Sequence, residues 1–402
     1  MKARIAIIGA GPIGIEAALQ ASKRGYDVSV YERERVGANL LDWGHVKLFS
    51  PWRMNTSQVG LRALGRSVRP AEELVTGRDL VEDYLLPLSI TPELRGKIFE
   101  GVRVIQIGRD RLVRTDLIGD PRRREHPFRL LLCQRAGQEY TAEADVVIDA
   151  SGVWGNPNFC GNGNIPAPGE LRHADRISYR LEDLQDPFGA ARYAGTRLLV
   201  VGAGHSAATT ICGLEDLIRR DPRTHALWVT RAGRRPPLVE SPDDPLPYRA
   251  HMVTRANEIA TRGQGVDHRA EMVIDSIEDG RERPLRVSLR GDREVLHEEV
   301  DYIIANCGFG PDNSLYRELQ VHECYATRGP MNLSAALLGD ASSDCLAQVN
   351  HGDETMMNPE PLFFVVGIKS YGKLSNFLLR IGREQVEAVF RLVEKEVPAL
   401  IS

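Results

Sequence analysis

Residues 7–16 read IIGAGPIGIE, and residues 200–209 read VVGAGHSAAT. In both stretches a short apolar run precedes Gly-x-Gly, and a helix-forming run follows. Such a strand, turning through glycines into a helix, is typical of an α/β unit with a parallel strand. The chain therefore repeats one strand–turn–helix pattern, once at its start and once near its middle.

The first turn has all three glycines of a dinucleotide-binding fingerprint. The predicted strand 4–8 leads into Gly9, Gly11 and Gly14. Gly9 permits a tight turn, Gly11 lets a diphosphate approach the backbone, and Gly14 lets the following helix pack closely on the strand. The helix N-terminus supplies amide donors to an anion. This turn is therefore predicted to bind a dinucleotide.

An acidic residue completes this first fingerprint. The helix is predicted to end near Gly25, and a second strand at 26–31 is followed by Glu32. A carboxylate at this place accepts hydrogen bonds from ribose hydroxyls. Glu32 and the adjacent Arg33 are assigned to the first cofactor site.

The second turn differs from the first at its third glycine. A predicted strand at 197–201 leads into Gly202, Gly204 and Ser206, and Ala207 occupies the place of the third glycine. Alanine is tolerated there. A second dinucleotide is therefore predicted at this turn.

The strand after the second turn, 226–230, ends in Arg231, with Arg234 and Arg235 just beyond. An arginine at this place suits a 2′-phosphate, so NADPH is favoured over NADH. The alternative is that Arg231 is a solvated surface charge. Two dinucleotides in one chain are usually held so that hydride can pass from a nicotinamide to a second redox ring.

Composition excludes several classes of protein. The chain has 402 residues and a net charge of −4, which gives no general attraction to nucleic acid or anionic membranes. Its N-terminal apolar run is short, and no run of 18 apolar residues follows, so a cytoplasmic protein is expected. The cysteines are isolated, without CxxC spacing, which argues against a redox dithiol and a metal site. They are Cys133, Cys160, Cys212, Cys307, Cys324 and Cys345. Without a dithiol, the second redox ring is most simply a flavin.

The chain resembles the two-dinucleotide-binding-domain flavoproteins, and within them the flavin-containing, Baeyer–Villiger and N-hydroxylating monooxygenases. Five segments carry the resemblance in order along the chain: IAIIGAGPIGIEAALQASKRGYDVSVYER (5–33), VVIDASGVWGNPN (146–158), LLVVGAGHSA (198–207), VDYIIANCGFGPDNSL (300–315) and PLFFVVGIKSYGKLSNFLLRIGREQVEAVFRLV (361–393). The resemblance implies an α/β fold of two Rossmann-like domains, one for FAD and one for NADPH.

The resemblance also implies a domain order. An FAD-binding domain is expected to comprise residues 1–155 and 305–402, with an NADPH-binding domain, 156–304, inserted between them. Gly308, in the return crossing, and Gly367, in the closing strand, are assigned to the cofactor sites. Separately, the apolar runs at 102–107, 128–133 and 146–150 predict a small β-layer on the FAD domain.

The implied reaction is an oxygenation. NADPH would reduce FAD, dioxygen would form a C4a-(hydro)peroxyflavin, and one oxygen atom would pass to a nitrogen or sulfur of a small molecule. Asn55, in the stretch Asn55-Thr56-Ser57, resembles the asparagine that faces the flavin in flavin-containing monooxygenases. The equally weighted alternative is that this stretch caps a helix.

Two departures from the family pattern stand out. Gly367 is followed by Ile368 and Lys369 where the family usually has Gly-Asp, and Lys369 is expected to contact an FAD phosphate instead. The Baeyer–Villiger fingerprint is only partly kept, with Gly169 and His173 at the right spacing but no phenylalanine before them. Baeyer–Villiger oxidation is therefore disfavoured.

Other functions stay open. One is an NADPH-dependent reductase that passes electrons from FAD to a small acceptor or a protein partner. Another is a flavin-binding subunit or sensor without turnover. The expected partners are a small substrate and dioxygen, without nucleic acid or membrane, and a homo-oligomer is compatible with the sequence.

Three further segments are predicted to be loops. They are 119–127, 241–249 and the Gly-Asp stretch at 338–340. Within the second, Asp243 and Asp244 would either bind an amine or be solvated, and solvation is favoured.

Overall fold

A computed structural model describes residues 2–241, 243–339 and 351–396. The chain divides into two compact units. Unit 1 comprises Met1–Asn156 and Gly310–Ser402, and unit 2 comprises Pro157–Phe309. Each unit has its own parallel sheet and is described by itself.

Unit 1 is built on a five-stranded parallel sheet in the order β16-β7-β1-β2-β3. The strands are β1 (Arg4–Ile8), β2 (Asp27–Glu32), β3 (Ile98–Glu100), β7 (Val146–Asp149) and β16 (Phe363–Val365). Ile8, at the end of β1, pairs with Tyr31 on one side and Asp149 on the other. The carboxyl ends of the strands therefore meet at one edge, where the first glycine turn lies.

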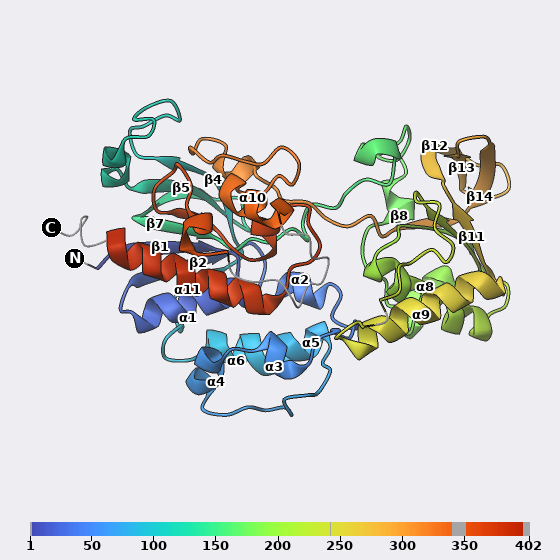
Figure 1. Cartoon of the computed structure of the whole chain (residues 1–402), viewed down its shortest axis with the longest axis horizontal. Coiled ribbons are helices and arrows are strands. Elements are labelled where there is room, and N and C mark those ends of the chain that lie inside the picture. The colour runs from blue at the N-terminus through green and yellow to red at the C-terminus, as the bar shows by residue number, and fades with distance from the viewer. Residues whose placement is uncertain (1, 242, 340–350, 397–402) are drawn as a thin grey trace. The chain divides into compact units, whose positions relative to one another are not determined.

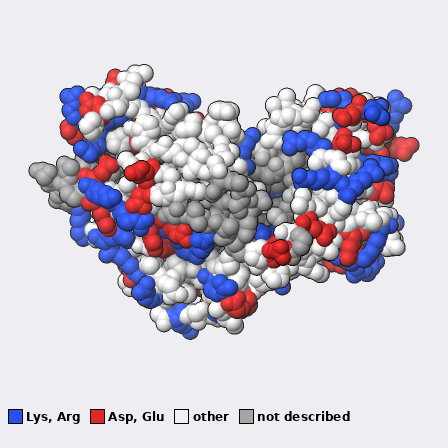
Figure 2. All heavy atoms as spheres, in the orientation of Figure 1, with Lys and Arg blue, Asp and Glu red and all other residues white. Residues whose placement is uncertain are grey.

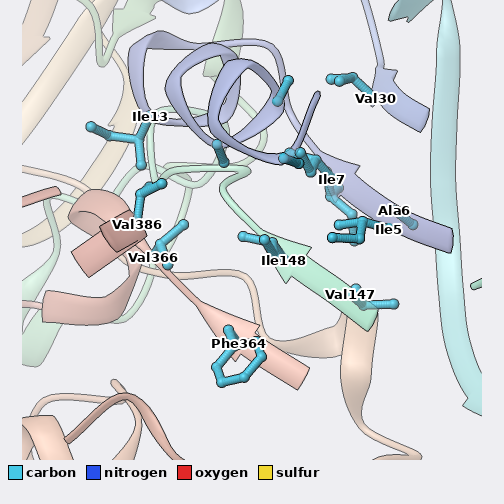
Figure 3. Close-up of a cluster of buried hydrophobic side chains, with 14 of the residues drawn as sticks. Ile5, Ala6, Ile7, Ile13, Val30, Val147, Ile148, Phe364, Val366 and Val386 are labelled. Atoms are coloured by element: carbon cyan, nitrogen blue, oxygen red, sulfur yellow. The ribbon is translucent and has the colours of Figure 1, made fainter. Parts of the chain in front are cut away.

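Two long helices of unit 1 pack against each other beside the sheet (Figure 1). They are α1 (Pro12–Lys23) and α11 (Leu379–Glu396). Figure 3 shows the core of this unit, in which Ile13 of α1 and Val386 of α11 lie near Ile148 of β7. Residues of α11, near the end of the chain, thus pack in the same core as residues of β1 and α1 at its start.

Shorter elements fill the rest of unit 1. The α-helices are α2 (Ala38–Leu41), α3 (Trp52–Asn55), α4 (Gln58–Leu64), α5 (Gly77–Leu80), α6 (Leu86–Ser89) and α10 (Met331–Gly339). The other helical turns are η1 (Val81–Leu85), η2 (Pro121–Glu125), η5 (Ser314–Tyr316), η6 (Asp353–Met356) and η7 (Gly367–Tyr371).

The small β-layer of unit 1 is a three-stranded antiparallel sheet. It comprises β4 (Val102–Arg109), β5 (Phe128–Gln134) and β6 (Glu139–Ala144). The prediction that residues 146–150 form its third strand is wrong, because Val146–Asp149 is β7 of the parallel sheet. The sequence hides β6, since only Ala144 of its six residues is buried and the strand is correspondingly polar.

The predicted exposed loop at 119–127 contains a buried cation. Arg123 is fully buried and donates from Nε to both carboxylate oxygens of Glu360, at 3.0 and 2.9 Å. Arg109 donates from Nε to the same carboxylate at 2.8 Å. Local polarity indicated exposure, but a carboxylate 237 residues away compensates the buried charge.

Unit 2 has a second five-stranded parallel sheet, in the order β11-β10-β9-β15-β8. Its strands are β8 (Ile177–Ser178), β9 (Arg197–Val201), β10 (His225–Thr230), β11 (Val266–Ala270) and β15 (Tyr302–Ala305). An unpredicted antiparallel sheet contains β12 (Val273–Asp279), β13 (Leu285–Arg290) and β14 (Val295–Val300). The helical elements are α7 (Pro187–Tyr193), α8 (His205–Arg220), α9 (Pro247–Arg262), η3 (Asn162–Asn164) and η4 (Ala174–Arg176).

Two other predicted loops are partly helical. Residues 338 and 339 end α10, while Asp340 lies outside the described residues. Residues 247–249 begin α9, where a proline at the first helical position is favourable because that position needs no amide donor.

The surface charge is mixed, as the small net charge of −4 predicts. On the face shown in Figure 2, positive and negative side chains are interspersed. Within the described parts of the chain, no helix combines the length and apolar character required to cross a bilayer.

Candidate cofactor sites

The three glycines of the first turn have three different surroundings. Gly9 has a φ of +95°, and a Cβ there would lie 2.9 Å from the carbonyl oxygen of Ala150. A Cβ on Gly14 would lie 1.9 Å from the carbonyl oxygen of Gly9. A Cβ on Gly11 would meet no atom within 4 Å. Gly9 and Gly14 are thus required by the fold, while Gly11 leaves space beside the N-terminus of α1 for a ligand.

The carboxylate of Glu32 lies against this turn. It accepts hydrogen bonds from the backbone amides of Ala10 at 2.8 Å and Glu34 at 2.9 Å. Burial raises the pKa of Glu32 above its usual range. Arg33 is half exposed, and its guanidinium lies beside Gly155.

A cavity opens along the same edge of the unit 1 sheet. Its volume, counting space open to solvent, is about 850 Å³. The polar residues that line it include Glu32, Arg33, Asn39, Arg103, Ser151, Asn156, Asp312, Ser314 and Lys369, together with Gly9. The cavity therefore joins the glycine turn, Glu32 and the segment after β16 in one unit.

Lys369 is almost fully buried, with 2% of its surface exposed. Its ammonium donates to Oδ2 of Asp149 at 2.6 Å and to Oγ of Ser151 at 3.1 Å. Asp149 is also fully buried and accepts from the hydroxyl of Ser151 at 2.6 Å. Sequence reasoning named Lys369 but not its partners, because Asp149, at the end of β7, and Ser151, just after it, are 220 and 218 residues away.

The other assigned glycines of the crossings also need positive φ. Gly367 has a φ of +72°, and its amide donates to Oε1 of the buried Gln385 of α11 at 2.9 Å. Gly308 has a φ of +79° and lies in unit 2, where its carbonyl accepts from the amide of Asn158. These two glycines shape the backbone, and their contact with a cofactor stays a prediction.

Asn55 is buried with its amide directed into its own loop. Both Nδ2 hydrogens are used, by the carbonyls of Ser50 at 2.8 Å and Pro51 at 3.0 Å. Its Oδ1 accepts from the hydroxyl of Ser50 at 2.9 Å. Ser57 caps α4 by accepting from the amide of Gly60. Helix capping is therefore the role of Ser57 within this stretch. The flavin contact of Asn55 stays a prediction, and both hydrogens of its side-chain amide are already donated within the loop.

The second turn repeats the geometry of the first. Gly202 has a φ of +132°, and a Cβ there would lie 2.3 Å from the carbonyl oxygen of Asn306. Gly204 begins α8, and a Cβ there would meet nothing within 4 Å. Ser206 lies in the first turn of α8, and Ala207 is fully buried in the place of the third glycine. Space is again left at the middle glycine and the helix N-terminus.

Positive charge gathers at the ends of β10 and β11. Arg231 is exposed immediately after β10, as is Arg235. Burial, followed by the charges of Arg235 and Arg269, lowers the pKa of His268 to about 4. This edge of unit 2 therefore has several guanidinium groups where the adenosine end of a dinucleotide is expected.

The remaining acids and the histidine have structural partners. Asp244 is paired with Arg249 at 2.7 Å in a half-buried position, which disfavours the amine-binding alternative for Asp244, while Asp243 is exposed. His173 lies 3.8 Å from Asp279. Between Gly169 and His173, the fully buried Glu170 accepts from three backbone amides and from Tyr179, and sequence reasoning missed it.

The described cysteines form no disulfide. Cys133, Cys160, Cys212, Cys307 and Cys324 are free, and Cys345 lies outside the described residues. Burial raises the pKa of Cys212 and that of Cys307 to about 12, and raises that of Cys160 further. Within residues 2–241, 243–339 and 351–396, no group of three or more His, Cys, Asp or Glu residues could hold a metal ion.

Comparison with known proteins found a matching family model and a curated relative. Residues 4–42 match the pyridine nucleotide-disulphide oxidoreductase family. A ferredoxin–NADP reductase of Ignicoccus hospitalis is 26% identical over 312 residues, which cover 76% of each chain.

Solved structures match nearly the whole chain at low identity. A bacillithiol disulfide reductase from Bacillus cereus has a TM-score of 0.71 and 16% identity, with 98% of this chain and 100% of that one covered. The ornithine N-hydroxylase of Kutzneria sp. 744 has a TM-score of 0.63 and 14% identity, with 99% and 100% covered.

These findings confirm the predicted α/β fold class with two Rossmann-like domains. Together they support an oxidoreductase that depends on FAD and a nicotinamide dinucleotide.

Proposed function

We propose that this two-dinucleotide-binding-domain flavoprotein is an NADPH-using monooxygenase. It would transfer one oxygen atom from dioxygen to a nitrogen or sulfur of a small molecule. The main support for two bound dinucleotides is the pair of similar glycine turns. In these turns Gly11 and Gly204 each leave open space at a helix N-terminus.

The residues divide the binding work between the two units. In unit 1, the amides around Gly11 bind the FAD diphosphate and Glu32 orients the adenosine ribose. In unit 2, the N-terminus of α8 binds the NADPH diphosphate and Arg231 pairs with the 2′-phosphate. We also assign FAD to residues 1–155 and 305–402 and NADPH to 156–304, as the sequence predicts. Asn55 would act indirectly, by fixing the loop from Ser50 onward.

Oxygenation is favoured over dithiol reduction by the state of the cysteines. The five described cysteines are free of disulfides, and burial raises the pKa of Cys160, Cys212 and Cys307, whereas hydrogen bonds with Thr327 lower that of Cys324. Electrons therefore have no evident route from the flavin to a disulfide among the described residues. Bound FAD accepts hydride and, once reduced, reacts with dioxygen. The overall balance is substrate, O₂, NADPH and H⁺ giving oxygenated substrate, water and NADP⁺.

The test combines isotope incorporation with NADPH consumption. Purified holoenzyme is incubated with NADPH, ¹⁸O₂ and a panel of primary amines and thioethers. A monooxygenase should consume one NADPH for each ¹⁸O atom found in the product by mass spectrometry. The proposal would be contradicted if no compound of the panel gave a labelled product and one hydrogen peroxide were released for each NADPH consumed.

A reductase is the second candidate, and the ferredoxin–NADP reductase relative favours it. The two functions differ without air. A reductase should oxidise NADPH anaerobically when ferredoxin or another protein acceptor is supplied, whereas a monooxygenase should require dioxygen. Rapid anaerobic transfer to ferredoxin without any oxygenated product in air would establish the second candidate.

A further inference from the structure

The cavity of unit 1 contains one feature that the expected glycine fingerprint does not require. Five charged residues line it, namely Glu32, Arg33, Arg103, Asp312 and Lys369. Arg33 and Arg103 are largely solvent-exposed, so among the lining residues only Lys369 is a buried cation.

Lys369 is held close to the glycine turn by a short chain of contacts. Its ammonium donates to Oγ of Ser151 at 3.1 Å. The Cα of Ser151 is 3.0 Å from the position that a Cβ on Gly9 would take. The ammonium group is therefore near the segment at which a diphosphate is expected.

The partners of Lys369 fix the position of its ammonium group. Asp149 accepts from the ammonium at 2.6 Å, and the face of the Tyr316 ring lies 5.2 Å from Nζ. An ammonium has three hydrogens, and the bonds to Asp149 and Ser151 use two of them. A buried lysine held by two such partners is pre-oriented, which lowers the entropic cost of binding an anion.

We infer that Lys369 recognises the diphosphate of FAD, and that Asp149 and Ser151 are the residues that position it. The inference rests on the proposed function only in taking FAD as the occupant of the cavity. Lys369 then supplies cationic recognition at a segment where the resembling family usually has an acidic residue. The alternative is that Lys369 only neutralises Asp149 inside the fold.

The test compares ligands with and without a diphosphate. Apoprotein is titrated calorimetrically with ADP and with adenosine, and FAD affinity is measured by flavin fluorescence. In Lys369→Gln, the affinity for ADP and FAD should fall at least tenfold while that for adenosine stays within threefold. Lys369→Arg should keep most of the preference for ADP, and Lys373→Gln, at an exposed lysine on the same segment, should change neither.

A double variant covers the case in which Lys369→Gln does not fold. Asp149→Asn with Lys369→Met removes both charges, so that neither is left buried and unpaired. This variant should also lose its preference for ADP over adenosine. Unchanged preference in a folded variant, or equal weakening for ADP and adenosine, would overturn the inference. Failure of the wild-type protein to bind FAD or ADP would instead contradict the proposed cofactor.

Discussion

Replacing Gly11 by alanine should impair FAD binding without unfolding unit 1, whereas replacing Gly14 by alanine should destabilise the fold. Gly11 has φ −78° and ψ −175°, which alanine adopts without strain, and its Cβ would meet no protein atom within 4 Å. The new methyl group would instead occupy the space that a diphosphate needs beside the amides.

The size of the Gly11 effect follows from one lost hydrogen bond. A hydrogen bond to a charged group contributes about 1.5–3 kcal/mol. FAD affinity in Gly11→Ala should therefore fall roughly 10- to 150-fold. Flavin fluorescence on titrating apoprotein measures this change, and denaturant unfolding of the apoprotein should differ from wild type by less than about 1 kcal/mol.

Gly14→Ala places a methyl group 1.9 Å from the backbone oxygen of Gly9, which cannot rotate away. Overpacking of this kind costs about 1–3 kcal/mol, and the better helix propensity of alanine returns about 0.5–1 kcal/mol. These ranges leave a net loss of up to about 2.5 kcal/mol, which lowers the Tm by up to roughly 5–10 °C. If Gly11→Ala destabilised the apoprotein as much as Gly14→Ala while FAD affinity stayed unchanged, the division of roles between these glycines would be refuted.

Three other substitutions give separate readouts. Arg231→Ala should raise the KM for NADPH at least tenfold and leave that for NADH nearly unchanged, as steady-state kinetics with both nucleotides would reveal. Glu360→Gln should destabilise the protein by about 3–5 kcal/mol in denaturant unfolding, because it leaves the buried Arg109 and Arg123 without a counter-charge; a loss below 1 kcal/mol would be inconsistent with this pairing. Because burial raises the pKa of Glu32 in the folded protein, its protonated form favours folding. This stabilisation is present below the unfolded pKa and is lost as the pH rises through the folded pKa. Glu32→Gln should therefore flatten that pH dependence and weaken FAD binding above it, and an unchanged pH profile of apoprotein stability would count against the assignment.

The fold class could be predicted because its signals are local. A strand, a glycine turn and a helix occupy about twenty consecutive residues in each unit, so the pattern is visible within one short stretch of sequence. The steric demands on Gly9 and Gly202 come instead from Ala150 and Asn306, which follow neighbouring strands of the sheets. The strands β6 and β14 were missed or misplaced, since each has a single buried residue. The strand β13 between β12 and β14 does alternate, with Leu285, Val287 and Leu289 buried, and was also missed.

The sequence by itself determined which residues form the two dinucleotide turns and which charges follow them. Only the tertiary structure decided what the other polar residues do. Lys369 finds Asp149 across 220 residues, and Arg109 finds Glu360 across 251. Asn55, which resembles a catalytic residue of the monooxygenases, donates both amide hydrogens within its own loop, and the sequence did not indicate these partners. The physical reason is that a buried charge or amide must be satisfied by whichever partner the fold brings close, and no local pattern names that partner.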